Sequence, residues 1–268
     1  MKLLDALQMV AGSEYEMAVN HTGGGWFDGA CWHLAAAVHE VMRLTGREAE
    51  LCHVSRNECS PDHAIVRFRD PGFSKALYID ADGIQTQRQM LEKMRSEGGS
   101  QGPWTIYSDH RWLTPEVEQS PLTERLKQAL YEKLNLTFYH VTPVENVPSI
   151  LEHGLVPTIG PRSEELGEPH STTFAFVDRQ ACETALGSWL GDEFEDVPED
   201  GLAILQIKSD IRPSSSDAGY EVLFTQPVPA ECFQVLGEDF RPLPEYAQAL
   251  TVDPLAAGVA HNQEAALR

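Results

Sequence analysis

The stretch YHVTPVENVPSILEHGL, residues 139–155, decides how the second half of the chain is expected to fold. It continues an apolar run that starts at Leu136 and indicates a β-strand. Apolar side chains then recur at helical spacing from Val144, and Gly154 stands where a helix would end. The sequence therefore predicts a strand that passes into a helix, with His140 near the end of the strand.

Further strands and one helix are predicted beyond this unit. Asp178 is a good N-cap for the helix RQACETALGSWL. Short runs rich in β-branched and aromatic residues predict strands. These runs are STTFAFV from Ser171, GLAILQIK from Gly201, YEVLFTQ from Tyr220 and CFQVLG from Cys232.

The first half of the chain mixes helices and strands in the same way. Helices are predicted over residues 1–18, from Cys31 to a cap at Gly46, and from Thr86. Strands are predicted from Ala49, His63 and Lys75, and a break at Ser120-Pro121 precedes another helix. We therefore expect an α+β protein of two domains. The expected parts are a first domain at 1–120, a linker helix at 121–135, a second domain at 136–247 and a tail at 248–268.

The charge of the chain limits its partners. Its 268 residues include 20 Lys and Arg against 41 Asp and Glu, a net charge of −21. Residues 1–130 carry 13 basic and 18 acidic residues, whereas residues 131–268 carry seven and 23. Such a surface repels phosphate backbones, so we expect no nucleic-acid partner. The acidic stretch GDEFEDVPED from Gly191 predicts a solvated loop, and no metal site is expected.

The sequence also suggests where the protein works. It contains no run of about 18 apolar residues, so no membrane span is expected. The five cysteines are scattered and form no CxxC pair, which favours a reducing compartment. Asp5 interrupts the first apolar stretch, so no signal peptide is predicted. We expect a cytoplasmic protein, with export as an effector by a dedicated machine as the alternative.

Three residues of the first half form a candidate nucleophilic site. Cys31 stands where a Gly-rich loop opens a helix, and a helix N-terminus stabilises a thiolate. His63 starts one strand and Asp80 lies on the next, so the two side chains can meet across a hairpin. Asp82 is the alternative third member. The competing interpretation is a packed cysteine beside an ordinary His–Asp pair.

This arrangement resembles the papain-like and transglutaminase-like cysteine fold over roughly residues 20–95. The resemblance rests on GACWHL around Cys31, DHAIVRF around His63 and YIDADG around Asp80. It implies a cysteine that attacks an amide carbonyl, as in peptidases, deamidases and transglutaminases. The chain departs from the family in its short length, which implies a minimal core.

Three ordered segments of the second half carry another resemblance. They are residues 139–155, STTFAFVDRQACETAL from Ser171 and YEVLFTQPVPAECFQVL from Tyr220. They resemble the His–Tyr–Glu branch of the ADP-ribosyltransferase fold over residues 136–237. The resemblance implies NAD as a substrate and a protein or small molecule as the acceptor. It implies His140 as a ribose ligand, Glu221 as the catalytic carboxylate, Phe174 as the ring that stacks on nicotinamide, Thr142 as a cofactor-binding hydroxyl and Arg162 as a pyrophosphate ligand.

The chain departs from this family at three positions. Val141 replaces a glycine, Phe174 replaces a tyrosine, and Gly219 stands where members that modify arginine carry a second acid. These changes leave two alternatives open. One is a binding or immunity module whose catalytic sites have decayed, and the other is a protein in which only the cysteine domain is active. The sequence indicates no oligomeric state.

Overall fold

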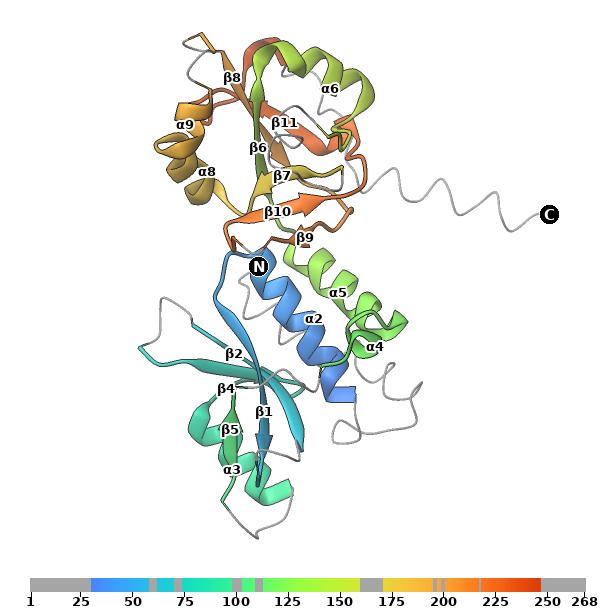
Figure 1. Cartoon of the computed structure of the whole chain (residues 1–268), viewed down its shortest axis with the longest axis vertical. Coiled ribbons are helices and arrows are strands. Elements are labelled where there is room, and N and C mark those ends of the chain that lie inside the picture. The colour runs from blue at the N-terminus through green and yellow to red at the C-terminus, as the bar shows by residue number, and fades with distance from the viewer. Residues whose placement is uncertain are drawn as a thin grey trace, which may run out of the picture. The chain divides into compact units, whose positions relative to one another are not determined.

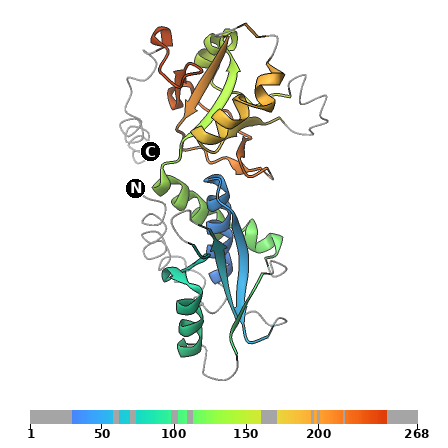
Figure 2. The same cartoon turned by 90° about the vertical axis from the view of Figure 1, so that its left-hand side faces the viewer.

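A computed structural model describes residues 30–57, 62–69, 74–97, 103–108, 113–159, 171–194, 197–198, 201–216 and 218–246. The chain divides into two compact units, Met1–Leu136 and Thr137–Arg268. Each unit contains helices and an antiparallel sheet (Figures 1 and 2), which confirms the predicted α+β class. The helix expected over residues 1–18, the tail and Arg162 lie outside the described residues.

The first unit is built on an antiparallel sheet whose described strands follow the order β4-β3-β2-β1-β5. Its elements are α2 (Cys31–Leu44), β1 (Ala49–Ser55), β2 (His63–Phe68), β3 (Leu77–Asp80), β4 (Gly83–Thr86), α3 (Gln87–Glu97), β5 (Thr105–Tyr107), α4 (Pro115–Glu118) and α5 (Pro121–Leu134). The predicted helix at Cys31 and the predicted strands at Ala49 and His63 are confirmed. Strands β4 and β5 were not predicted.

Both faces of this sheet are buried. On β2, Val66 and Phe68 belong to the apolar cluster formed with α2 and α5, whereas Ile65 belongs to the cluster that holds Met90 and Met94 of α3. Successive side chains of a strand point to opposite faces, so the two clusters lie on opposite sides of the sheet. This explains why HAIVRF is apolar almost throughout rather than strictly alternating.

Helix α5 occupies the segment expected to be a linker. The Ser120 side chain caps it by accepting from the Thr123 backbone N–H at 3.1 Å, and Pro121 stands at its first turn. Leu126 and Leu130 are buried in the same cluster as α2, and α2 and α5 lie side by side (Figure 1). The helix therefore belongs to the first unit and contributes to its core.

The second unit contains another antiparallel sheet, with described strands in the order β11-β8-β6-β7-β10-β9. Its elements are β6 (Phe138–Pro143), η2 (Val144–Asn146), α6 (Val147–His153), β7 (Thr173–Phe176), α8 (Arg179–Leu186), α9 (Trp189–Glu193), β8 (Leu202–Ile207), β9 (Ser214–Ser215), β10 (Glu221–Phe224), η3 (Ala230–Cys232) and β11 (Phe233–Leu236). The predicted N-cap is confirmed, because the Asp178 side chain accepts from the Ala181 N–H at 2.8 Å.

This sheet has two halves joined at one point. Strand β6 pairs with β8 along its whole length, from Phe138 to Pro143. It pairs with β7 only at Tyr139 and Phe176, after which the two strands diverge. His140 is the next residue of β6 after this junction. The part of β6 that follows this junction, from His140 to Thr142, lines a cavity.

Gly154 fixes the path of the chain after α6. Its φ is +81°, in the region that side chains disfavour. A Cβ placed there would lie 2.7 Å from the carbonyl oxygen of Val228. The glycine predicted to end this helix is therefore required by both backbone conformation and space.

No helix in the described part of the chain combines the length and the apolar character needed to cross a bilayer.

Candidate functional sites

The first candidate site lies where α2, β2 and β3 meet. His63 Nε2 is 3.0 Å from Asp80 Oδ2, and both side chains are buried. The Cys31 side chain also interacts with His63, and this interaction raises the pKa of the imidazole. The structure therefore brings together the three residues that the sequence selected.

Several polar groups hold the Asp80 carboxylate in addition to His63. Its Oδ1 accepts from the Asp82 backbone N–H at 3.0 Å and from Gln85 Nε2 at 2.8 Å. Its Oδ2 lies 2.7 Å from Lys93 Nζ, and Lys93 also forms an ion pair with the Asp82 carboxylate. Asp80, not the alternative Asp82, is thus the carboxylate hydrogen-bonded to the histidine. Lys93 and Gln85 were not predicted.

These contacts set the protonation of the pair. Burial by itself lowers the pKa of His63, but hydrogen bonds and charge interactions with Asp80 and Cys31 outweigh it and raise the pKa to about 9. Burial by itself raises the pKa of Asp80, but His63 and Lys93 outweigh it and lower that pKa. At neutral pH His63 is therefore an imidazolium beside an ionised Asp80. An imidazolium next to a cysteine stabilises the thiolate form.

Two other cysteines lie in inert surroundings. Burial raises the pKa of Cys52 to about 11 and that of Cys182 to about 12. Such thiols remain protonated at neutral pH. Cys31 is also buried, with 3% exposure, and it interacts with His63. Cys59 lies outside the described residues.

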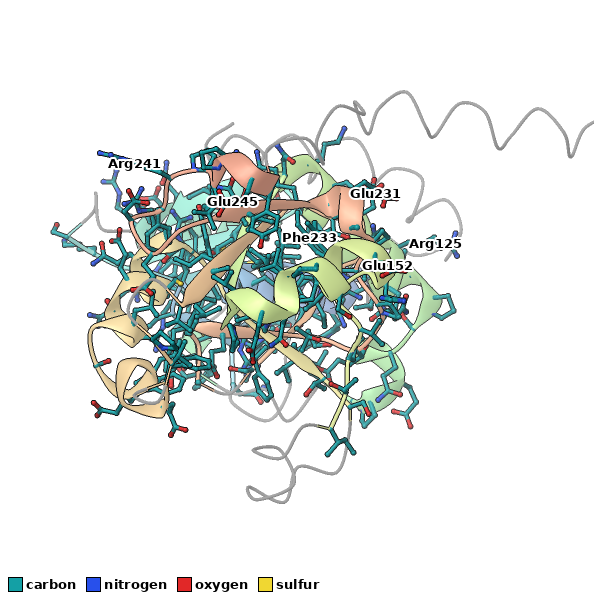
Figure 3. All side chains as sticks on the ribbon, turned by 90° about the horizontal axis from the view of Figure 1, so that it is seen from above. Arg125, Glu152, Glu231, Phe233, Arg241 and Glu245 are labelled. Atoms are coloured by element: carbon teal, nitrogen blue, oxygen red, sulfur yellow. The ribbon has the colours of Figure 1, made fainter. Side chains whose placement is uncertain are left out.

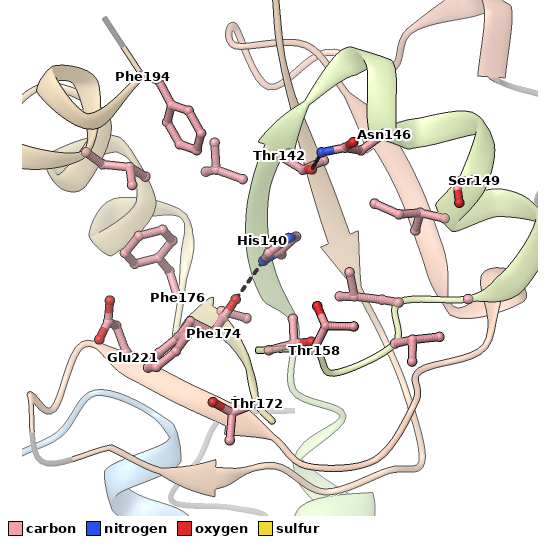
Figure 4. A pocket seen from close by; sticks show the side chains of 18 of the residues that line it. His140, Thr142, Asn146, Ser149, Thr158, Thr172, Phe174, Phe176, Phe194 and Glu221 are labelled. Atoms are coloured by element: carbon pink, nitrogen blue, oxygen red, sulfur yellow. Dashed lines mark hydrogen bonds between the residues drawn. The ribbon is translucent and has the colours of Figure 1, made fainter. Parts of the chain in front are cut away.

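The second candidate site is a cavity of about 870 Å³ in the second unit. Four sequence-selected residues line it: His140, Thr142, Phe174 and Glu221. They come from three strands, β6, β7 and β10, and Figure 4 shows them around one space. Arg162, the fifth residue selected for this site, lies outside the described residues.

The protonation of His140 follows from its backbone contact. His140 Nδ1 lies 2.7 Å from the carbonyl oxygen of Phe174 (Figure 4). Because a carbonyl oxygen can only accept, Nδ1 carries the hydrogen. Burial lowers the pKa of His140, and the backbone hydrogen bond offsets this only in part. The imidazole is therefore neutral near pH 7, and Nε2 is an acceptor for a ligand hydroxyl.

An aromatic wall forms one side of the cavity. Its rings belong to Phe174, Phe176, Trp189, Phe194 and Tyr220. The ring centroids of Phe176 and Trp189 are 6.5 Å apart. Glu221 is paired in register with Phe176 and lies at this end of the cavity (Figure 4). A flat ring seated here would have aromatic neighbours and a carboxylate close by.

Polar side chains also line the cavity. Thr142, Ser149, Thr158 and Thr172 contribute hydroxyls, and Asn146 Nδ2 donates to Thr142 Oγ1 at 3.3 Å. The described lining residues include no Lys or Arg. These groups suit a nicotinamide ring and a ribose. For the pyrophosphate of NAD, the described lining offers hydroxyls but no cation.

Val141 has a structural role. Its side chain is 8% exposed and packs with Phe176, Ile204 and Leu236. Val141 is therefore part of the apolar core and also lines the cavity.

Comparisons with protein-family models, with curated proteins and with solved structures each gave no match. Within the described residues, no group of three or more His, Cys, Asp or Glu side chains could hold a metal ion.

Proposed function

We propose that the second unit is an NAD-consuming ADP-ribosyltransferase with an ADP-ribosyltransferase-like split sheet. One observation carries the proposal: the histidine, the aromatic ring and the glutamate selected from three distant segments line one cavity. Random core residues of these types would have no reason to share a cavity large enough for a ligand. Thr142, on the same strand as His140, adds a hydroxyl to the ligand side.

Each residue has a defined task in this reaction. Phe174 stacks on the nicotinamide ring, and His140 Nε2 accepts a hydrogen bond from a ribose hydroxyl. Glu221 stabilises the positive charge that develops on the ribose as the glycosidic bond breaks. Nicotinamide leaves with the electron pair of that bond. The acceptor nucleophile then bonds to the ribose carbon, and its proton passes to the Glu221 carboxylate and on to solvent.

Release of nicotinamide from NAD tests this proposal directly. The purified full chain should release nicotinamide, and Glu221→Gln should slow release by about 100-fold or more, because a charge that stabilises the transition state is lost. Glu238→Gln is the matched control, since it removes an exposed carboxylate of the same unit that does not line the cavity. Equal rates for the two variants, or no release by the native chain, would contradict the proposal and favour a decayed binding module.

We further propose that the first unit has a papain-like or transglutaminase-like core with a Cys–His–Asp amide-handling site. The interactions of His63 with Asp80 and with Cys31 support this second activity. The thiolate attacks the amide carbonyl, the C–N bond breaks, and the His63 imidazolium gives its proton to the leaving amine. Water or another amine then releases the acyl group from sulfur.

Alkylation distinguishes this site from a packed cysteine. At pH 6, iodoacetamide should label Cys31 faster than Cys52, with each thiol followed by peptide mass spectrometry. His63→Ala should remove the difference. If Cys31 reacts no faster than Cys52 in the native chain, the thiol is not activated. We propose a cytoplasmic location for both activities, which agrees with a reducing environment for these thiols.

A further inference from the structure

The exposed apolar side chains of the second unit gather at its cavity. Among the described residues, the large apolar side chains that are exposed are Val156 (46%), Ile159 (42%), Trp189 (37%) and Tyr220 (43%). Val156, Trp189 and Tyr220 line the cavity, and Ile159 follows Thr158, which also lines it. We call these four residues the apolar rim. Scattered exposed apolar residues need no explanation, but a group at one site indicates binding.

The surroundings of the rim are acidic. The second unit, Thr137–Arg268, contains 22 Asp and Glu but only six Lys and Arg. The short elements that form the cavity walls, η2, α6 and α9, contain no Lys or Arg. They carry the exposed carboxylates of Glu145, Glu152 and Asp192, and Glu152 can be followed on α6 in Figure 3.

We propose that the apolar rim is the docking surface for a basic polypeptide segment that presents a large apolar side chain. The apolar side chain would be buried against Trp189 and Tyr220, while lysines or arginines of the segment approach the surrounding carboxylates. Apolar burial supplies the affinity, and complementary charge speeds association and excludes acidic partners. A nucleic acid is excluded by the same charge.

This inference deepens the proposed transferase function, because it names the acceptor as a basic protein. The docking itself does not depend on NAD turnover. A segment seated on the rim would place its reactive side chain next to Glu221, which follows Tyr220 directly and lines the same cavity.

Peptide binding to the full chain tests the docking surface. The probes are fluorescein-labelled Lys/Leu/Trp peptides, with matched Glu/Leu/Trp and Lys/Ser peptides, followed by fluorescence anisotropy without NAD. The Lys/Leu/Trp peptides should bind most tightly and should weaken as salt increases. Tyr220→Ser and Trp189→Ser should each weaken binding by about tenfold or more.

Charge variants give the matched control. The double variant Glu152→Gln/Asp192→Asn should weaken peptide binding and reduce its salt dependence. The control is the double variant Glu238→Gln/Glu245→Gln, which removes the same charge from exposed positions outside the cavity lining and should leave binding unchanged. Thermal unfolding establishes that each variant is folded. Because Tyr220 is the more exposed of the two, at 43% against 37%, Tyr220→Ser remains a fair test if Trp189→Ser unfolds the unit.

The possible results separate the two proposals. Equal binding of acidic and basic peptides, or unchanged binding by the Tyr220 variant, overturns the docking surface. If that occurs while nicotinamide release still requires Glu221, the transferase proposal stands and its acceptor is a different molecule. If basic apolar peptides bind and no nicotinamide is released, the surface stands and the transferase proposal fails.

Discussion

Replacing Asp80 with asparagine should change how the stability of the first unit depends on pH. Asp80 raises the pKa of His63, which has an ordinary value of 6.5 and is about 9 in the folded chain. That difference corresponds to about 3 kcal/mol of folding free energy, and the hydrogen bond with Asp80 is the largest single favourable contribution to it. Asparagine keeps the shape of the side chain but removes its charge from both His63 and Lys93.

The direction of the pH effect follows from the raised pKa. In the native chain the stabilisation is fully present below pH 6.5, and it is lost as pH rises through 9. Asp80→Asn should therefore be about 2–3 kcal/mol less stable than the native chain at pH 6. The part of this difference in unfolding free energy that comes from His63 should decrease toward pH 9.5.

Urea unfolding at several pH values measures this change, with exposure of the buried Cys52 thiol as a probe specific to the first unit. Asp82→Asn is the control, because it removes an exposed carboxylate that pairs with the same lysine. Its effect should stay below about 1 kcal/mol, as for other surface pairs. The reasoning is refuted if the Asp80 variant keeps the native pH dependence or if the two variants lose equal stability.

Two further predictions concern backbone space and the lysine beside Asp80. Gly154→Ala should lower the melting temperature of the second unit more than Gly219→Ala. Both glycines have positive φ, but only at Gly154 would an added Cβ lie against a carbonyl oxygen. If both variants lower the melting temperature equally, the positive φ explains the whole loss and the close contact at Gly154 does not contribute. Lys93→Met should raise the pKa of His63 further, because a nearby positive charge that opposes the imidazolium is removed, whereas Lys93→Arg should leave it near its native value. An NMR titration of the His63 ring measures both, and an unchanged or lower pKa in Lys93→Met would contradict this account.

The sequence predicted the elements whose pattern is strong. Helix α2 has a broad apolar face, and β1 and β2 have continuous buried residues, so their starts at Cys31, Ala49 and His63 follow from the pattern. Strands β4 and β5 were missed because each has only three or four residues and little buried apolar surface. Their place in the sheet is determined by pairing with β3 and β1, which no local pattern shows.

For the candidate sites, the sequence predicted the central residues but not the side chains around them. The first site was predicted from the spacing of Cys31, His63 and Asp80, and the second from the order of three later segments. Lys93 could not be named, because it reaches Asp80 only through the packing of α3 on the sheet. The other rings that line the cavity with Phe174 were missed for the same reason, since Trp189 comes from a helix whose position depends on tertiary contacts.

The two sites use the same side chain in opposite protonation states, and the partner group explains the difference. His63 faces a buried carboxylate, which together with Cys31 stabilises the charged ring more than burial penalises it. His140 faces a carbonyl oxygen, a weaker partner that does not offset the cost of burying charge. A charged imidazole suits a site that must stabilise a thiolate and donate a proton. A neutral imidazole suits a site that must accept a hydrogen bond from a sugar hydroxyl beside a developing positive charge, because a second positive charge there would oppose the reaction. The residue type alone therefore does not determine the protonation state of either histidine. The group that accepts its hydrogen bond does, a carboxylate for His63 and a backbone carbonyl for His140.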